Sequence, residues 1–300
     1  RLYAFILLGS NSSTPPNVVR TVSPPEDAHS AYAQEIRKKL ANSTDAELLT
    51  AAGQHLMFYA AHPGGREFDF DPRALGKSYL ERALQLNPQS VQAREPLVGS
   101  RAGERSQRMY KILQNAPKES QYQTISALPE AERFEFLPGL AEGAYFEGED
   151  ADYKKDQAAA KASWDRTKKY AQDALTLAKK FPNDPNCGMA VYRGNMVLGT
   201  LAMWEGDKKN AVRYLLYASK APASEELAYT THPASERLVK YLLKYGERES
   251  VIEFWERMAQ INLIEKNYIL ESAAAVRRGQ MPEAYQATMT RQADSGTGGR

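Results

Sequence analysis

Apolar and small residues recur along the chain at the spacing of one face of an α-helix. Ala211 and Ala218 follow Gly206 at such a spacing. The same order, a glycine followed five residues later by an alanine or a valine, recurs after Gly246 and Gly279. Each stretch predicts a turn followed by a helix that packs through small side chains, and the whole pattern predicts an all-α protein.

Similar stretches lie before these turns, so the helices are expected in pairs. Leu198 and Gly199 precede Gly206 on one predicted helix, where the glycine lets a second helix approach closely. Two earlier units share this design but carry extra residues between their helices, at 62–72 and 147–156. The positions that define the repeat are Gly53, Ala83, Gly143, Ala174, Leu198, Gly199, Gly206, Ala211, Ala218, Gly246 and Gly279.

The unit around Gly206 resembles the tetratricopeptide repeat, in which a leucine and a glycine precede a turn glycine that two alanines and a proline follow. Leu198, Gly199, Ala211, Ala218 and Pro222 occupy these places, with the proline one residue early. The resemblance implies a tetratricopeptide-like α-solenoid of about five helix pairs with an extended N-terminal arm. The C-terminal half also resembles uncharacterised repeat proteins that bacteria secrete, and that likeness implies no function.

In the tetratricopeptide family the first helices line a concave groove. Carried over to this chain, the candidate groove is mainly apolar, which favours an apolar strand or helix as its ligand over an acidic C-terminal peptide. An equally weighted alternative is that these residues simply pack against the neighbouring repeat. The implied groove residues are Leu137, Leu140, Arg193, Met196, Val197, Thr200, Met203 and Trp204.

The expected domain organisation has four parts. Residues 1–25 form an apolar arm and a proline-rich spacer, and residues 292–300 form a glycine-rich and serine-rich tail. Residues 119–291 form the main repeat array. Residues 26–118 contain a capping helix, an N-terminal helical unit and a connector, in which Pro96 and two glycines are expected to break the chain before a helix that begins near Glu104.

The apolar arm consists of Tyr3, Phe5, Ile6, Leu7 and Leu8. Burial of such side chains is favourable by about 1.5–3 kcal/mol each, whereas an exposed β-prone run without charge promotes aggregation. The spacer contains four prolines and can extend by about 3 Å per residue. We therefore expect the arm to insert into another copy of the chain, which builds a filament or a ring. The alternative is that it folds back onto its own chain.

Composition excludes several other functions. The 39 basic and 37 acidic residues are interspersed, with a net charge of +2, so no basic stripe is available for nucleic acid. No apolar run approaches the roughly 20 residues of a membrane helix. A single cysteine cannot form an intrachain disulfide, and the four histidines lack the spacing of a zinc site. We expect no cofactor and no metal.

No nucleophile or nucleotide-binding motif accompanies these residues, so the expected protein is non-enzymatic. The leading hypothesis is an extracellular scaffold that assembles with itself through its arm. The alternative is an adaptor that binds an apolar peptide of another protein in the cell envelope or the cytoplasm. Asn11 and Asn42 each begin a glycosylation sequon, and a secreted or surface location in a bacterium is favoured over the cytoplasm.

Overall fold

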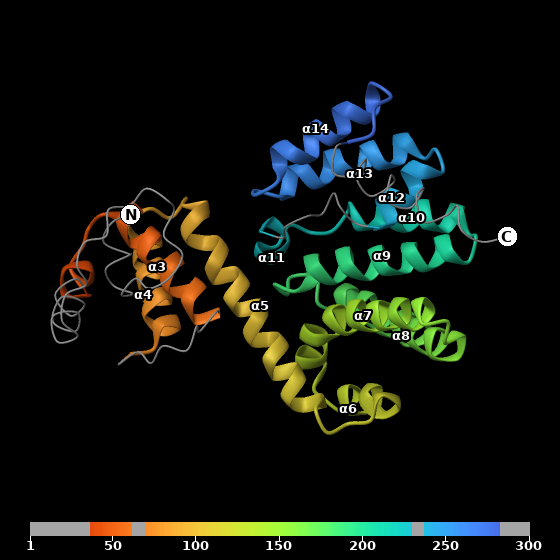
Figure 1. Ribbon diagram of the computed structural model, residues 1–300, viewed down its shortest axis with the longest axis horizontal. Coiled ribbons are helices and arrows are strands. Elements are labelled where there is room, and N and C mark those ends of the chain that lie inside the picture. Colours follow the sequence, from red (N-terminus) through yellow and green to blue (C-terminus); the bar gives the residue numbers. More distant parts are fainter. Residues whose placement is uncertain (1–36, 62–69, 230–236, 283–300) are drawn as a thin grey trace. The chain divides into compact units, whose positions relative to one another are not determined.

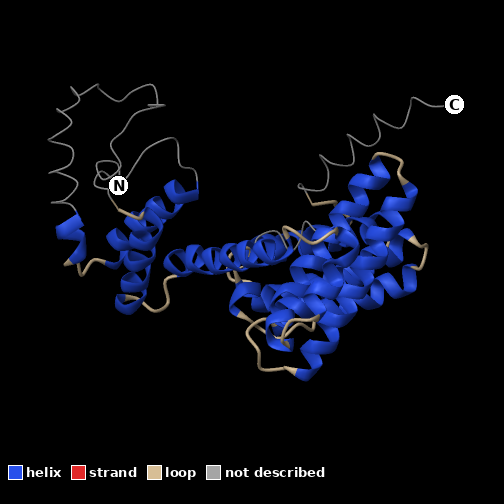
Figure 2. Ribbon diagram, turned by 90° about the horizontal axis from the view of Figure 1, so that it is seen from below, coloured by secondary structure: helices blue, strands red, loops and turns tan. Residues whose placement is uncertain are grey.

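The computed structural model describes residues 37–61, 70–229 and 237–282. Within these residues every regular element is helical and no strand occurs, which confirms the all-α prediction (Figure 2). The helices are α3 (Ala46–Ala61), α4 (Pro72–Leu86), α5 (Val91–Leu113), α6 (Gln121–Ser126), α7 (Glu130–Tyr153), α8 (Gln157–Lys180), α9 (Cys187–Trp204), α10 (Lys208–Ala218), α11 (Glu225–Ala228), α12 (Arg237–Lys244), α13 (Arg248–Ile261) and α14 (Lys266–Arg277), with a 3₁₀ turn at Lys118–Ser120 (Figure 1).

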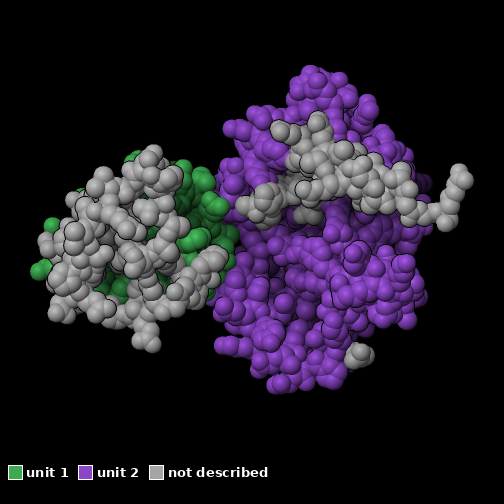
Figure 3. Space-filling model, in the orientation of Figure 1, with its two compact units in different colours: residues 1–100 green, residues 101–300 purple. Residues whose placement is uncertain are grey.

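The chain divides into two compact units within α5 (Figure 3). Unit 1 comprises Arg1–Ser100 and unit 2 comprises Arg101–Arg300. The division expected from the sequence, between residues 118 and 119, lies farther along the chain. The predicted capping helix lies mostly outside the described residues, although residues 37–41 are helical.

In unit 1 the helices α3 and α4 form a closely packed pair. A Cβ on Gly53 would lie 2.9 Å from the carbonyl oxygen of Gly76, so the two backbones approach each other directly. Leu56 and Leu80 are fully buried beside this crossing. α4 begins at Pro72 because the Asp71 side chain accepts hydrogen bonds from two backbone N–H groups of its first turn.

The predicted break in the connector is wrong, because α5 runs without interruption from Val91. Pro96 has no N–H to donate to the carbonyl of Gln92, four residues earlier. The side-chain amide of Gln54 donates to that carbonyl at 2.9 Å. An acceptor that the proline would leave without a partner is thereby satisfied from a neighbouring helix, and the α5 helix continues through the proline.

In unit 2 one type of turn joins the two helices of each of three hairpins. The α7/α8, α9/α10 and α12/α13 turns each contain one residue with a positive φ angle, and the same turn ends α14. The next residue donates its N–H to the carbonyl five residues before it, which is the hydrogen bond of a Schellman motif. The residues with positive φ are Lys155, Gly206, Gly246 and Gly279, and the hydrogen bonds are Asp156 to Ala151, Asp207 to Ala202, Glu247 to Leu242 and Gln280 to Ala275.

Residues 147–156, expected as an insertion, instead complete the first of these hairpins. Residues 147–153 form the last turns of α7, and the short turn at Lys155 follows. The sequence pattern missed this turn because a lysine occupies the left-handed position that glycine occupies in the other three.

The register of the α7/α8 hairpin also differs from the expected one. Gly148 precedes Lys155 by seven residues, as Gly199 precedes Gly206. A Cβ on Gly148 would lie 2.2 Å from the indole nitrogen of Trp164, whereas one on Gly143 would meet nothing within 4 Å. Gly148 is therefore the position of close helix approach, and Gly143 is not.

Helix α9 is central to unit 2, because it packs against α7, α8, α10 and α12. Two clusters of buried side chains fill the unit, and residues of α9 belong to both. Its sequence is accordingly apolar on almost every face, with Arg193 as its single charged residue. A Cβ on Gly199 would lie 3.1 Å from the Cβ of Tyr214 on α10, so the expected close approach at Gly199 is confirmed.

Candidate functional site: a charge-balanced cavity in unit 2

A cavity of about 190 Å³ opens beside the first helices of the three hairpins. It lies against α7, α9 and the first residue of α12. Its walls are apolar and aromatic in the middle, with three charged side chains among them. The lining residues are Glu142, Tyr145, Phe146, Tyr192, Arg193, Met196, Val197, Thr200 and Arg237.

Four of the eight predicted groove residues line this cavity, namely Arg193, Met196, Val197 and Thr200. The other four do not line it. Leu137 is fully buried and Leu140 is 8% exposed, and both pack into the core with α8. Met203 packs against the other buried cluster and Trp204 packs against aromatic neighbours. The surroundings of these four residues are those of the alternative expectation, in which such residues pack against neighbouring helices.

An aromatic series leads from the core to the cavity. Trp164 contacts Trp204 edge-on at 4.9 Å between ring centroids, and Trp204 stacks on Tyr145 at 5.4 Å. Tyr145 in turn contacts Phe146 at 5.4 Å. Phe146 is 51% exposed, so the series ends in a large apolar side chain that is open to a ligand.

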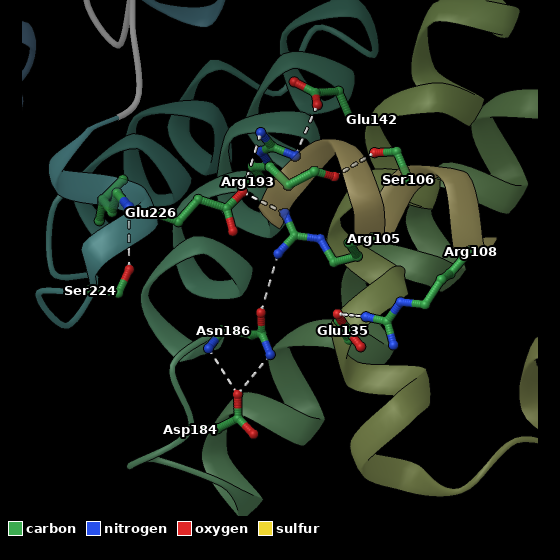
Figure 4. A network of polar contacts seen from close by, with 12 residues as sticks. Arg105, Ser106, Arg108, Glu135, Glu142, Asp184, Asn186, Arg193, Ser224 and Glu226 are labelled. Atoms are coloured by element: carbon green, nitrogen blue, oxygen red, sulfur yellow. Dashed lines mark hydrogen bonds and ion pairs between the residues drawn. The ribbon is translucent and has the colours of Figure 1, made fainter. Parts of the chain in front are cut away.

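Each arginine of the cavity is paired with a glutamate. Arg193 lies 3.3 Å from Glu142 and 3.9 Å from Glu226. Figure 4 shows the arrangement of these three side chains. Arg237, at the start of α12, is ion-paired with Glu149 of α7. Glu149 also accepts a hydrogen bond of 2.7 Å from the Tyr145 hydroxyl. The positive charges of the cavity are therefore balanced by carboxylates that belong to the protein itself.

A largely buried ion pair supports Arg193 through a shared glutamate. Arg105 of α5 donates to Glu226 of α11 at 2.6 Å, and the two side chains are only 17% and 16% exposed. Arg105 also donates to the Asn186 side chain at 3.4 Å, next to the start of α9 (Figure 4). Because Glu226 contacts both arginines, this network fixes the position of Arg193 at the cavity wall.

The lone cysteine lies apart from this cavity. Cys187 is 4% exposed, and its Sγ lies 3.6 Å from the Ala178 carbonyl oxygen. Burial raises the pKa of its thiol, with a smaller contribution from the negative charge of Asp184. A raised pKa keeps the thiol protonated at neutral pH, so Cys187 has the surroundings of a structural residue.

The arm residues Tyr3, Phe5, Ile6, Leu7 and Leu8, and the sequon at Asn11, lie outside the described residues. The second sequon lies in a turn after residues 37–41, where Asn42 is exposed. Its side-chain amide donates to the Lys38 carbonyl at 3.4 Å. The Asn42 side chain is therefore accessible at the surface of unit 1.

Five residues that line the cavity are not among the groove residues expected from the sequence: Glu142, Tyr145, Phe146, Tyr192 and Arg237. Correct placement of the Lys155 turn would have brought the face of α7 that carries Tyr145 into register with α9. Arg237 had no signal in the sequence, because its pairing with Glu149 joins the first and third hairpins across the intervening one.

No helix among the described residues has the length and apolar character needed to cross a membrane. The described residues also contain no cluster of three or more side chains suited to a metal ion. No family model, no curated protein and no solved structure matches this chain.

Proposed function

We propose that the protein is a non-enzymatic scaffold whose helical hairpins bind an apolar segment of a protein chain in the cavity between α7, α9 and α12. The observation that carries the proposal is the combination of an exposed Phe146 with arginines that are already paired. An apolar segment gains from contact with the aromatic wall, and it requires no charged partner. The repeated turn and the resemblance to the tetratricopeptide repeat support an α-solenoid with binding as its role.

We propose further that the segment is the N-terminal arm of another copy. The arm contains Tyr3 and a continuous apolar run from Phe5 to Leu8, with no charged residue between Leu2 and Ser10. This chemistry suits a cavity whose charges are balanced. Repetition of the contact from one copy to the next would build a filament or a ring, and the setting proposed for such an assembly is a bacterial surface or the extracellular space.

Sedimentation velocity of the full chain at several concentrations tests this proposal. We expect species larger than a monomer that grow with concentration, and a monomer after deletion of residues 1–8. Phe146→Asp should also yield a monomer, because it places a charge against the apolar segment. The matched control is Tyr153→Asp on the same helix, since Tyr153 is 88% exposed and does not line the cavity. A wild-type monomer at all concentrations would contradict self-assembly.

The alternative is an adaptor whose cavity binds an apolar peptide of another protein. The cavity chemistry supports this occupant as well. One comparison distinguishes the two functions. The adaptor function predicts that the wild-type chain is a monomer that binds a hydrophobic peptide, and that the Phe146→Asp variant does not bind this peptide. Loss of binding in Tyr153→Asp as well would mean that the cavity is not the binding site.

A further inference from the structure

Unit 1 contains a second pocket whose charge differs from that of the unit 2 cavity. It has a volume of about 560 Å³ and lies between residues 37–41 and one face of α4. This volume falls within the range of about 300–1,000 Å³ that is typical of small-molecule sites. The lining residues are Arg37, Lys38, Ala41, Leu75, Ser78, Tyr79 and Arg82.

Three cationic side chains converge on this pocket from its two walls. Arg37 and Lys38 come from residues 37–41, and Arg82 comes from α4. Among the described residues, no aspartate or glutamate lines the pocket, and Lys38 and Arg82 form no ion pair. Lys38 and Arg82 carry like charges on the two walls of the pocket, and a bound anion would relieve the repulsion between them.

The remaining wall offers both hydrogen-bonding and apolar contacts. The Ser78 hydroxyl donates to the Leu75 carbonyl at 2.8 Å, and the hydroxyl oxygen can still accept a hydrogen bond. Leu75 and Ala41 provide apolar surface. Tyr79 is 4% exposed, so it forms a rigid part of the wall. Burial raises the pKa of Tyr79, and the positive charge of Arg37 opposes the shift. The Arg37 guanidinium lies over the Phe70 ring, 4.6 Å from its centroid.

We propose that this pocket binds a small organic polyanion that carries phosphate or carboxylate groups. Arginine and lysine bind both groups through charge-assisted hydrogen bonds, and Lys38 and Arg82, one from each wall, suit a ligand with at least two anionic groups. The pocket is larger than one inorganic phosphate requires, and the surface of Leu75 and Ala41 accommodates the carbon skeleton of the ligand. This site is independent of the segment-binding cavity of unit 2.

Isothermal titration calorimetry of the full chain tests the site, with pyrophosphate and citrate as probes at constant ionic strength. We expect saturable binding of one or both probes at one site. Arg82→Ala and Lys38→Ala should each weaken binding about tenfold, which corresponds to about 1.4 kcal/mol. Arg73→Ala is the matched control, because it removes the same charge from α4 at a position that does not line the pocket.

The two probes separate the chemistry of the ligand. Binding of pyrophosphate alone identifies a phosphorylated ligand, and binding of citrate alone identifies a carboxylate ligand. The proposal is overturned if neither probe gives more heat than sodium chloride of equal ionic strength. It is equally overturned if Arg73→Ala weakens binding as much as Arg82→Ala does. Circular dichroism tests whether each variant is folded. If Arg82→Ala or Lys38→Ala is not folded, Lys38→Gln is measured in its place.

Discussion

The pockets of the two units contain arginine, yet the surroundings of the arginines differ. In unit 2 Arg193 and Arg237 are each paired with a glutamate, and an exposed phenylalanine stands beside them. In unit 1 Lys38 and Arg82 line a pocket to which, among the described residues, no carboxylate contributes. Under the two proposals, the ligand of each pocket depends less on the number of its basic residues than on whether the protein already supplies their counter-charges.

The interiors of the two units are more alike than their pockets. In each unit a glycine allows a helix to approach its partner closely, Gly53 in unit 1 and Gly148 or Gly199 in unit 2. The connections differ, because α3 and α4 are joined by residues 62–71 whereas the hairpins of unit 2 use the short turn around Lys155, Gly206 or Gly246. Similar packing is thus combined with connections of different length and with different pocket charges.

The largest effect is expected from the charge network of unit 2. Arg105→Ala should lower the free energy of unfolding by about 2–3 kcal/mol, because it leaves Glu226 largely buried without its closest partner. The control is Arg101→Ala, one helical turn away. Arg101 pairs with Glu225 at 2.6 Å, but their side chains are 56% and 46% exposed, so we expect a loss below about 0.5 kcal/mol. Urea denaturation measures both, and equal losses would contradict the structural role of the network.

The packing of unit 1 is tested by Gly53→Ala. The added methyl would meet Leu80 Cγ at 2.6 Å and the Gly76 carbonyl oxygen at 2.9 Å, so we expect a net loss of about 1–2 kcal/mol. Gly143→Ala is the control, since its methyl would meet nothing within 4 Å. It should stabilise by up to about 1 kcal/mol through helix propensity. A similar thermal stability for both variants would show that the helices do not approach as closely as described.

The repeated turn of unit 2 predicts a stabilising substitution. Lys155 has a φ of 63°, a conformation that costs a residue with a side chain about 1–2 kcal/mol. Lys155→Gly should therefore raise the free energy of unfolding by about 0.5–1 kcal/mol, after the greater flexibility of glycine in the unfolded chain is subtracted. Gly206→Lys is the reciprocal change and should destabilise by a similar amount. Thermal denaturation of both variants measures the pair, and a destabilising Lys155→Gly would refute the equivalence of the turns.

Removal of a charge from the unit 1 pocket should have a different consequence. Arg82→Ala is expected to change the free energy of unfolding by no more than about 0.5 kcal/mol, because within residues 37–61, 70–229 and 237–282 Arg82 has no counter-ion whose burial it supports. This result would sharpen the contrast with Arg105→Ala in unit 2. A loss as large as that of Arg105→Ala would instead mean that the cations of the pocket have a structural role. Urea denaturation without added polyanion makes the comparison.

The smallest effect concerns pH and the cap of α10. The pKa of Asp207 is lowered, mainly because its carboxylate accepts a hydrogen bond from the backbone N–H of Asn210. A lowered folded-state pKa stabilises the protein above the unfolded value, and this contribution disappears as the pH falls through the folded-state pKa, below about pH 4. Asp207→Asn keeps the cap but removes the charge. Its stability difference from the wild type should be present at pH 7 and should vanish in acid.

The sequence predicted the all-α class and the turns at Gly206, Gly246 and Gly279, because glycine marks a left-handed position directly. It missed the turn at Lys155, where no glycine marks the same conformation. The continuity of α5 through Pro96 was also missed, since it depends on a hydrogen bond from Gln54, which is distant in the sequence. Local patterns indicate turns and helix faces, whereas exceptions to them depend on tertiary contacts.

The candidate site was predicted only in part for the same reason. Met196, Val197 and Thr200 line the cavity from α9, and the resemblance to the tetratricopeptide repeat implied these positions. The pairing of Arg193 with Glu142 and Glu226 joins three helices, and no spacing along the chain encodes it. The resemblance to the tetratricopeptide repeat supplied a groove, but the charge balance of the cavity became visible only in three dimensions.

The most direct test of the central claim is the salt dependence of arm binding to the unit 2 cavity. A peptide of residues 1–10 is titrated into a chain that lacks residues 1–8. The signal is the intrinsic tryptophan fluorescence, to which Trp204, stacked on Tyr145, contributes. We predict an affinity that changes less than about twofold between about 0.05 and 0.5 M salt, because exposed charges are screened and apolar contacts are not. We also predict that Phe146→Asp abolishes binding of the peptide. An affinity that falls steeply with salt, or that survives Phe146→Asp unchanged, would contradict a charge-balanced cavity that binds an apolar segment.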